Sequence, residues 1–294
     1  MHENPVFGRL QTAMVTPFND DGSLNYPEAR RLAAYLVDEQ GNDALVVNGT
    51  TGEAPTTSDA EKKRLLAEVV AEVGDRAKIV AGVGTFDTAH TLQLTADAED
   101  AGADGLLVVT PYYSRPPQDA LADHFITVAE ATGLPIMVYD IPHRCGVPVE
   151  TATLVQLAAH PRIVAVKDAK AMPVASAQVM AQTSLQYYAG DDAMLLPLLA
   201  LGADGVVGTS THFTGRRTKQ LIELFRTGQP EAALRLFRQL LPVYTGVFAT
   251  QGCLLVKAGL AARGFRPGGV RKPLLEASSQ QAEAFVAILD AAGA

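Results

Sequence analysis

The chain has 294 residues, of which 48% are hydrophobic and 19% are charged, as in an ordinary globular protein. Its net charge of -8 leaves no basic surface for nucleic acid or for an anionic membrane. No apolar run approaches the roughly 18 residues of a membrane span, and the N-terminal residues MHENPVFGRL do not have the form of a secretion signal.

Short apolar, β-branched runs alternate with helical patterns from the N-terminus to about residue 226. Strands that are apolar on both faces are typical of a covered parallel sheet. The predicted strands are Leu10–Pro17, Ala44–Gly49, Lys78–Gly84, Gly105–Thr110, Pro135–Asp140, Ile163–Lys167, Leu185–Gly190 and Gly205–Thr209.

The helices between these strands have both apolar periodicity and start signals. After the first strand, Pro27 precedes apolar residues at positions i, i+3, i+4, i+7 and i+8, beginning at Ala29. After the second, Ser58 and Glu61 have the spacing of a capping box. From about residue 231 only helical patterns remain, at Ala232–Val247, Cys253–Ala262 and Ser279–Ala291, with a loop at Gly264–Gly269.

Eight strand–helix units predict an α/β fold, a (β/α)8 TIM barrel over residues 1–226, with a helical region over residues 227–294. A doubly wound sheet is the alternative. It usually has fewer strands and a Gly-rich phosphate turn after the first strand. Here the first strand ends in Thr16-Pro17-Phe18, which favours the barrel.

The active site of such a barrel lies at the C-terminal ends of the strands. Strand six brings Lys167 to this mouth in the apolar run VAVKD. One interpretation is a strand end returning to water, with Lys167 paired to Asp168 or Asp140. The other is a buried amine whose lowered pKa makes it a Schiff-base nucleophile. Lys257, in LLVKAGL, is the other lysine in apolar company, but it falls in the helical region.

The other side chains at the mouth each allow two interpretations. The turn Gly49–Glu53 is either a tight loop or an anion site built from backbone N–H groups and threonine hydroxyls. Tyr113 and Tyr139 are either packing residues or a proton relay. Arg144 is either a surface charge or a fork for a substrate carboxylate. No His/Cys cluster predicts a metal.

With these residues assembled, the chain resembles the dihydrodipicolinate synthase / N-acetylneuraminate lyase family of class I aldolases. The resemblance covers nearly the whole length. Its motifs are AMVTPF at 13–18, GTTGE at 49–53, PYYSRPP at 111–117, YDIPHR at 139–144, VKDAK at 166–170 and GDD at 190–192.

The resemblance implies a reaction of pyruvate with an aldehyde, and no metal or organic cofactor. Lys167 would form the imine and Tyr139 would carry protons, with Thr51 and Tyr113 completing the relay. Thr50 and Thr51 would hold the pyruvate carboxylate, while Gly190 and Val207 would line the imine pocket. Tyr113 would reach into a neighbouring subunit, which implies a dimer as the working unit and a homotetramer as the usual assembly.

Within the family, GTTGE and Arg144 favour the synthase branch, in which the aldehyde is aspartate semialdehyde. Two departures, Gly208 where many synthases have serine and His212 where they have asparagine, leave other aldehydes open. One alternative is another pyruvate-dependent aldolase or hydro-lyase of the family, of the N-acetylneuraminate or 2-keto-3-deoxy sugar acid type. A non-catalytic keto-acid-binding barrel is the other. Asp59, Lys62 and His90 replace residues of the lysine-inhibited members, so we expect weak or absent feedback by lysine.

The two cysteines, Cys145 and Cys253, have no CxxC spacing. Such usage indicates a reducing compartment, and we expect the protein to be cytoplasmic.

Overall fold

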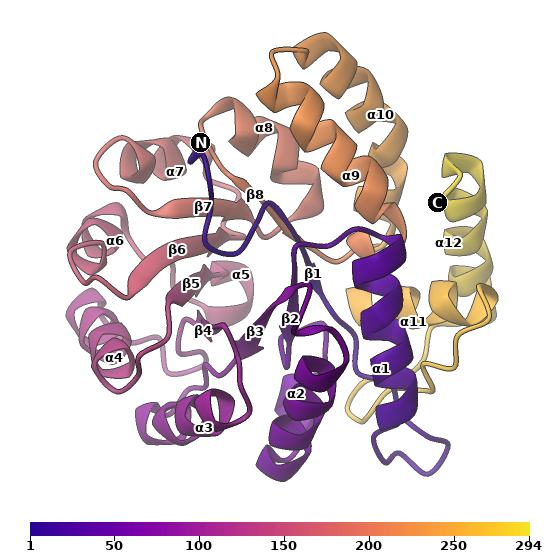
Figure 1. The fold of residues 1–294 in the computed structure, drawn as a ribbon, viewed down its shortest axis with the longest axis horizontal. Coiled ribbons are helices and arrows are strands. Elements are labelled where there is room, and N and C mark those ends of the chain that lie inside the picture. Colours follow the sequence, from indigo (N-terminus) through magenta and orange to yellow (C-terminus); the bar gives the residue numbers. More distant parts are fainter.

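The computed structural model describes all 294 residues and contains a closed barrel of eight parallel strands (Figure 1). Each strand pairs with the next along the chain, and β8 returns to β1. The strands are β1 (Leu10–Ala13), β2 (Ala44–Val47), β3 (Lys78–Gly82), β4 (Gly105–Val109), β5 (Ile136–Asp140), β6 (Ile163–Asp168), β7 (Gln186–Ala189) and β8 (Gly205–Gly208). The predicted (β/α)8 barrel is confirmed, and the doubly wound alternative is wrong.

Most strands are shorter at their C-terminal ends than the sequence predicts. The sequence predicts that the first strand continues to Pro17, but its pairing as a strand ends at Ala13. The residues that follow leave the regular ladder and form the loops at the mouth of the barrel. Apolar content does not separate a strand from a buried loop that continues it, because both exclude water.

Helices cover the outside of the barrel, and both predicted start signals are present. Pro27 lies in the first turn of α1, and Ser58 and Glu61 form a reciprocal capping box on α2. The helices after the strands are α1 (Tyr26–Ala34), α2 (Asp59–Val73), α3 (Thr88–Asp100), α4 (Gln118–Glu130), α5 (Pro142–Cys145), α6 (Thr151–Leu157), α7 (Pro173–Met180), α8 (Leu195–Ala200) and α9 (Thr211–Arg226).

Three further helices follow the barrel, as the periodicity predicts: α10 (Pro230–Gly246), α11 (Gly252–Ala262) and α12 (Ser279–Ala292). They lie on the side of the barrel that carries α1 and α9 (Figure 1). Their apolar side chains, such as Val243, Leu255 and Leu289, belong to the same core cluster as the barrel shell. A division into two domains at residue 226 stays a prediction.

A second apolar cluster fills the barrel interior and includes Val46, Met137, Ala165, Tyr188 and Val207. This packing closes the barrel below, so chemistry is confined to its mouth. No helix combines the length and the hydropathy that crossing a bilayer would require.

Candidate active site

A cavity of about 650 Å³ opens at the C-terminal ends of the strands. Six of the predicted site residues line it: Thr50, Thr51, Tyr139, Arg144, Lys167 and Gly190. They come from the ends of β2, β5, β6 and β7, so the barrel brings together residues that lie far apart in the sequence. Nowhere do three or more His, Cys, Asp or Glu side chains gather in a way that could hold a metal ion.

Lys167 is the central amine of this cavity. The residue is 5% exposed, and its Nζ lies 4.3 Å from the centroid of the Tyr139 ring. Burial lowers the pKa of Lys167 to about 8; Asp192 opposes this shift and Arg144 adds to it. A lysine with a pKa near 8 has roughly a few hundred times more free amine at neutral pH than one near 10.5. Such an amine is a nucleophile suited to carbonyl substrates.

The suggested pairing of Lys167 with Asp168 or Asp140 is wrong, because a different lysine pairs with both. Lys170 Nζ lies 2.9 Å from Asp140 Oδ2 and 4.0 Å from Asp168 Oδ2, and all three side chains are buried. The strand register places Asp140 opposite Asp168 and Tyr139 opposite Lys167. Lys170 therefore supplies a positive charge to the two carboxylates beside Lys167 and joins the two strands that carry the amine and the phenol.

Tyr139 is buried beside the amine. Burial raises the pKa of its phenol above the usual range, although Arg144 and Thr50 act in the opposite direction. The phenol therefore stays protonated at neutral pH. A proton donor next to a nucleophilic amine is the arrangement that general acid catalysis requires.

The turn at Thr50 and Thr51 is suited to an anion. Neither backbone N–H donates an intramolecular hydrogen bond, and both residues line the cavity. The Thr51 hydroxyl lies 3.4 Å from the hydroxyl of Thr209, which the sequence analysis did not single out. Unused N–H donors and hydroxyls together form a binding site for a carboxylate.

Arg144 lies on the short helix α5 at the rim, where it is exposed and makes no salt bridge. Because its five N–H donors are not used within the chain, the guanidinium can donate two hydrogen bonds to a carboxylate, in the bidentate geometry that arginine favours.

Glycine at position 190 gives the Lys167 side chain its path to the cavity. A Cβ on Gly190 would lie 3.0 Å from Lys167 Cγ and 3.0 Å from Ala169 Cβ. Gly208 is similarly restricted, because a Cβ there would lie 2.7 Å from Asp192 Oδ1. Val207 is buried with Tyr139 in the barrel interior and does not line the cavity.

Tyr113 is separate from the other predicted residues. It is 95% exposed, has a φ of +76° and lines neither of the cavities at the barrel mouth. A left-handed, bulky residue is strained and persists only where structure or function requires it. Within one chain, therefore, Tyr113 does not reach Tyr139.

Part of the cavity wall comes from outside the barrel and is not predicted by the strand ends. Residues from the end of α10 to the start of α11 line the cavity: Tyr244, Thr245, Phe248, Thr250, Gln251, Gly252 and Cys253. The sequence feature that could have indicated this wall is TGVFATQG at 245–252, where threonine, glutamine and glycine residues interrupt two apolar helices.

A second cavity of about 520 Å³ adjoins the first and shares Thr50, Tyr139, Ile141 and Arg144 with it. Asp59, Lys62 and His90 line its far side. His90 Nε2 lies 3.0 Å from Asp59 Oδ2, and Lys62 Nζ lies 3.8 Å from Asp59 Oδ1. The single carboxylate of this group is thus already paired with basic side chains.

Comparison with known proteins gives consistent results. The model of the "Dihydrodipicolinate synthetase family" matches residues 6–292. The 4-hydroxy-tetrahydrodipicolinate synthase of Cutibacterium acnes is 58% identical over 286 residues, which is 97% of this chain and 98% of the relative.

Among solved structures, the lysine-bound enzyme of Cyanidioschyzon merolae is 36% identical with a TM-score of 0.96, covering 99% of both chains. The pyruvate complex of the chloride-inhibited dihydrodipicolinate synthase of Acinetobacter baumannii is 31% identical with a TM-score of 0.93, covering 98% of this chain and 99% of the other.

Proposed function

The chain belongs to the dihydrodipicolinate synthetase family, and we propose that it condenses pyruvate with aspartate 4-semialdehyde to give 4-hydroxy-tetrahydrodipicolinate. It is a Schiff-base lyase of the class I aldolase type. The observation that carries the proposal is the buried, unpaired amine of Lys167, whose pKa is lowered to about 8, beside the protonated phenol of Tyr139.

The reaction begins with attack of the Lys167 amine on the keto carbon of pyruvate. Thr50 and Thr51 hold the substrate carboxylate through their unused N–H groups and hydroxyls. Tyr139 donates a proton to the departing hydroxyl, water leaves, and a protonated imine forms. The positive nitrogen then acts as an electron sink, so loss of a methyl proton gives an enamine.

The enamine carbon adds to the aldehyde of the second substrate, and Arg144 orients that substrate through its carboxylate. The semialdehyde's own amine then attacks the imine carbon and displaces Lys167. The ring closes and the enzyme's amine is restored. Among the possible aldehydes, an acidic one is favoured by the unpaired guanidinium of Arg144 at the rim.

We further propose that the working unit is a dimer and the full assembly a homotetramer. Tyr113 is exposed but has the strained backbone of a functional residue, and Phe86, which packs edge-on against Tyr112, is 63% exposed. A second chain packed on these aromatic residues would bury them and bring its own Tyr113 to the relay of Thr51 and Tyr139.

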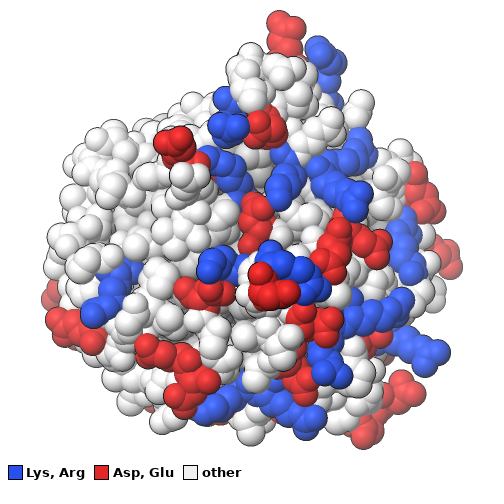
Figure 2. Space-filling view, viewed as in Figure 1, with Lys and Arg blue, Asp and Glu red and all other residues white.

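A second surface supports the tetramer. No charged residue occurs from Ala171 to Ala189, where Met172 and Val174 are 54% and 73% exposed. Figure 2 shows the corresponding side of the molecule, over α6 and α7, nearly free of charged side chains. A surface that lacks charged residues and exposes apolar side chains is typical of the core of an interface.

Cys145 and Cys253 are buried free thiols, which supports our inference that the protein works in the reducing cytoplasm.

Borohydride reduction in the presence of pyruvate, followed by peptide mapping, tests the imine. We expect a stable adduct on Lys167 and none in Lys167→Ala. An unlabelled wild-type protein would exclude the mechanism and leave a non-catalytic barrel. An aldehyde panel with product analysis then separates aspartate semialdehyde from sugar-acid substrates: faster turnover of a sugar-derived aldehyde would overturn the synthase assignment.

A further inference from the structure

Lys257 is a buried lysine for which the reaction has no use. Its side chain is 4% exposed, and its Nζ donates to Glu53 Oε1 at 2.7 Å and to the Gly269 carbonyl at 2.6 Å. The ammonium also lies 4.2 Å from the centroid of the Phe18 ring. These contacts join three parts of the chain that are distant in sequence.

Glu53 is the last residue of the turn that carries Thr50 and Thr51. It has a left-handed φ of +57°, and its carboxylate is 1% exposed. Its second oxygen, Oε2, accepts the Arg271 backbone N–H at 2.9 Å. A non-glycine residue in this conformation persists only when its surroundings hold it. The buried bonds of its carboxylate hold Glu53 together with the backbone bonds of the turn.

Residues 265–271, here called the C-terminal strap, supply the other half of this arrangement. The Pro267 carbonyl accepts the Phe18 N–H at 3.0 Å, and the Arg271 guanidinium donates to the Thr56 carbonyl at 2.8 Å. A cavity of about 910 Å³ lies beneath the strap, beside α11 and α12.

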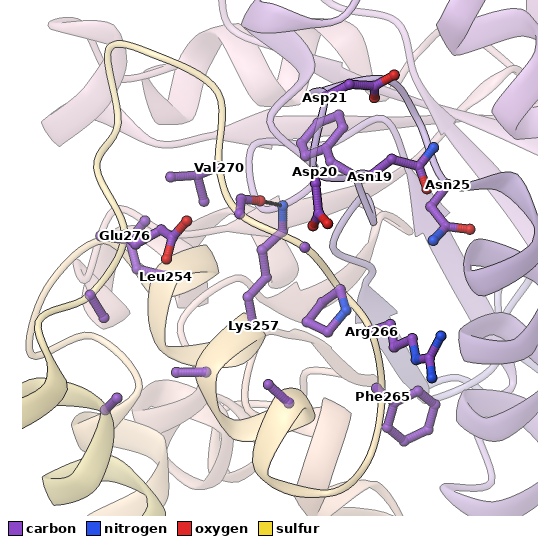
Figure 3. Close-up of a pocket in the computed structure, with 18 of the residues that line it drawn as sticks. Asn19, Asp20, Asp21, Asn25, Leu254, Lys257, Phe265, Arg266, Val270 and Glu276 are labelled. Atoms are coloured by element: carbon purple, nitrogen blue, oxygen red, sulfur yellow. Dashed lines mark hydrogen bonds between the residues drawn. The ribbon is translucent and has the colours of Figure 1, made fainter.

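In Figure 3 Lys257 rises from α11 to meet the strap, with Val270 and Asp20 on opposite sides. Phe265 and Val270 pack the strap against the core. Because a cavity lies beside the rest of it, the hydrogen bonds and ion pairs to Phe18, Glu53 and Lys257 also hold the strap in place.

We propose that Glu53 and Lys257 are positioning residues that set the geometry of the Thr50–Thr51 turn, so that the helical region after the barrel determines how well pyruvate is captured. The inference rests on the proposed function for the identity of the ligand. Neither residue lines the catalytic cavity, so the pair acts through the turn.

The test compares Glu53→Gln, Lys257→Met and Lys257→Arg with Arg263→Met, a control in the same helical region. Arg263 also forms a salt bridge in the helical region, to Asp290, but does not contact the turn. Two quantities are measured: the pyruvate concentration for half-maximal borohydride trapping, and hydrogen exchange at the amides of residues 52–54, which bond within the turn.

We expect Glu53→Gln and Lys257→Met to raise the half-maximal pyruvate concentration by about tenfold, since a small misplacement of a positioning group is enough for losses of this size. The maximal trapping rate should change far less. Lys257→Arg keeps the charge and should recover most of the loss, and Arg263→Met should match the wild type. Hydrogen exchange in the turn should become faster in Glu53→Gln and Lys257→Met alone.

Unchanged pyruvate dependence in Glu53→Gln would overturn the inference, even if its thermal stability were lower, because the pair would then be only structural. Glu53→Gln keeps the size of the side chain, so it decides the question if Lys257→Met does not fold. A wild type that takes no label would refute the proposed function instead. The exchange measurement would still decide whether the pair holds the turn.

Discussion

Burial shifts the pKa values of two neighbouring side chains, Lys167 and Tyr139, in opposite directions. Burial lowers the pKa of Lys167 to about 8, and burial also raises the pKa of Tyr139. The same loss of water therefore frees an amine and keeps a phenol protonated, because in each case the neutral form is favoured. The same burial thus prepares both a nucleophile and an acid.

The pH dependence of imine trapping follows from this. Below a pH of about 8 the Lys167 amine is protonated, so the trapping rate at fixed pyruvate should rise with pH and level off above that value. Because the Arg144 guanidinium lowers the pKa of Lys167, Arg144→Met should move the midpoint to higher pH. A stopped-time borohydride assay across pH 6 to 10 measures the midpoint for the wild type and for Arg144→Met. An unshifted midpoint in the variant would mean that Arg144 does not lower the pKa of Lys167.

The same pKa has a consequence for stability. The folded state releases the Lys167 proton near pH 8 and the unfolded chain near 10.5, so the unfolded state binds more protons between these values. The contribution of Lys167 to the free energy of unfolding therefore rises with pH over this window.

Tyr139→Phe removes the acid but keeps the ring over the amine. General acid–base assistance is typically worth 10²–10⁴-fold, so kcat should fall by about this factor while the protein stays folded. Tyr187→Phe is the matched control, because Tyr187 is a buried tyrosine whose hydroxyl has no hydrogen-bond partner. Steady-state turnover of both variants gives the comparison, and equal rates would exclude Tyr139 as the acid.

At the scale of elements, β5 and β6 are joined by the buried group of Lys170, Asp140 and Asp168. Removing one partner of a buried pair leaves an uncompensated charge, which typically costs 3–5 kcal/mol. Lys170→Met should lower the free energy of unfolding by about this amount in a urea titration. Lys78→Met breaks the exposed pair with Asp104 and should cost at most about 1 kcal/mol. Equal losses would mean that Lys170 is not needed to compensate the buried carboxylates.

The first turns of α2 and α3 carry the residues that predict the response to lysine. Asp59 is paired with His90 and Lys62, and Lys62 adds a positive charge to the wall of the second cavity. A cationic amino acid would meet repulsion there and no free carboxylate. We predict that sub-millimolar lysine leaves more than half of the activity, with the Cyanidioschyzon merolae enzyme as a reference for lysine binding. Half-inhibition in that range would contradict this.

Much of the order of strands and helices could be predicted from the sequence. The partners of the buried charged residues could not, for physical reasons. Buried parallel strands are recognisable because both faces are apolar, and Ser58 and Glu61 mark a helix start by their spacing. The role of Lys170 could not be predicted, because KDAK has the composition of a chain returning to water. The pairing of Lys257 with Glu53 also cannot be predicted from the residues around Lys257, since Glu53 lies 204 positions away in the sequence.

Exposed apolar side chains occur around Phe86 and Tyr113 and, separately, on α7 and the residue before it, at Val174 and Met172. If the second surface joins dimers, Val174→Asp should give dimers in sedimentation velocity while imine trapping at Lys167 persists, because the site lies elsewhere. Leu275→Asp is the control, since Leu275 is 74% exposed but lies outside both surfaces. A wild type that sediments as a monomer would refute the assembly proposed above.

The wall formed by residues 244–253 allows substrate choice to change without changing the reaction. These residues shape one side of the reaction chamber, yet none belongs to a barrel strand. Remodelling this segment could alter which aldehyde fits while the carbonyl chemistry on β5 and β6 stays intact. A library of variants for new acceptors would therefore begin late in the chain, more than 70 positions beyond the nucleophile.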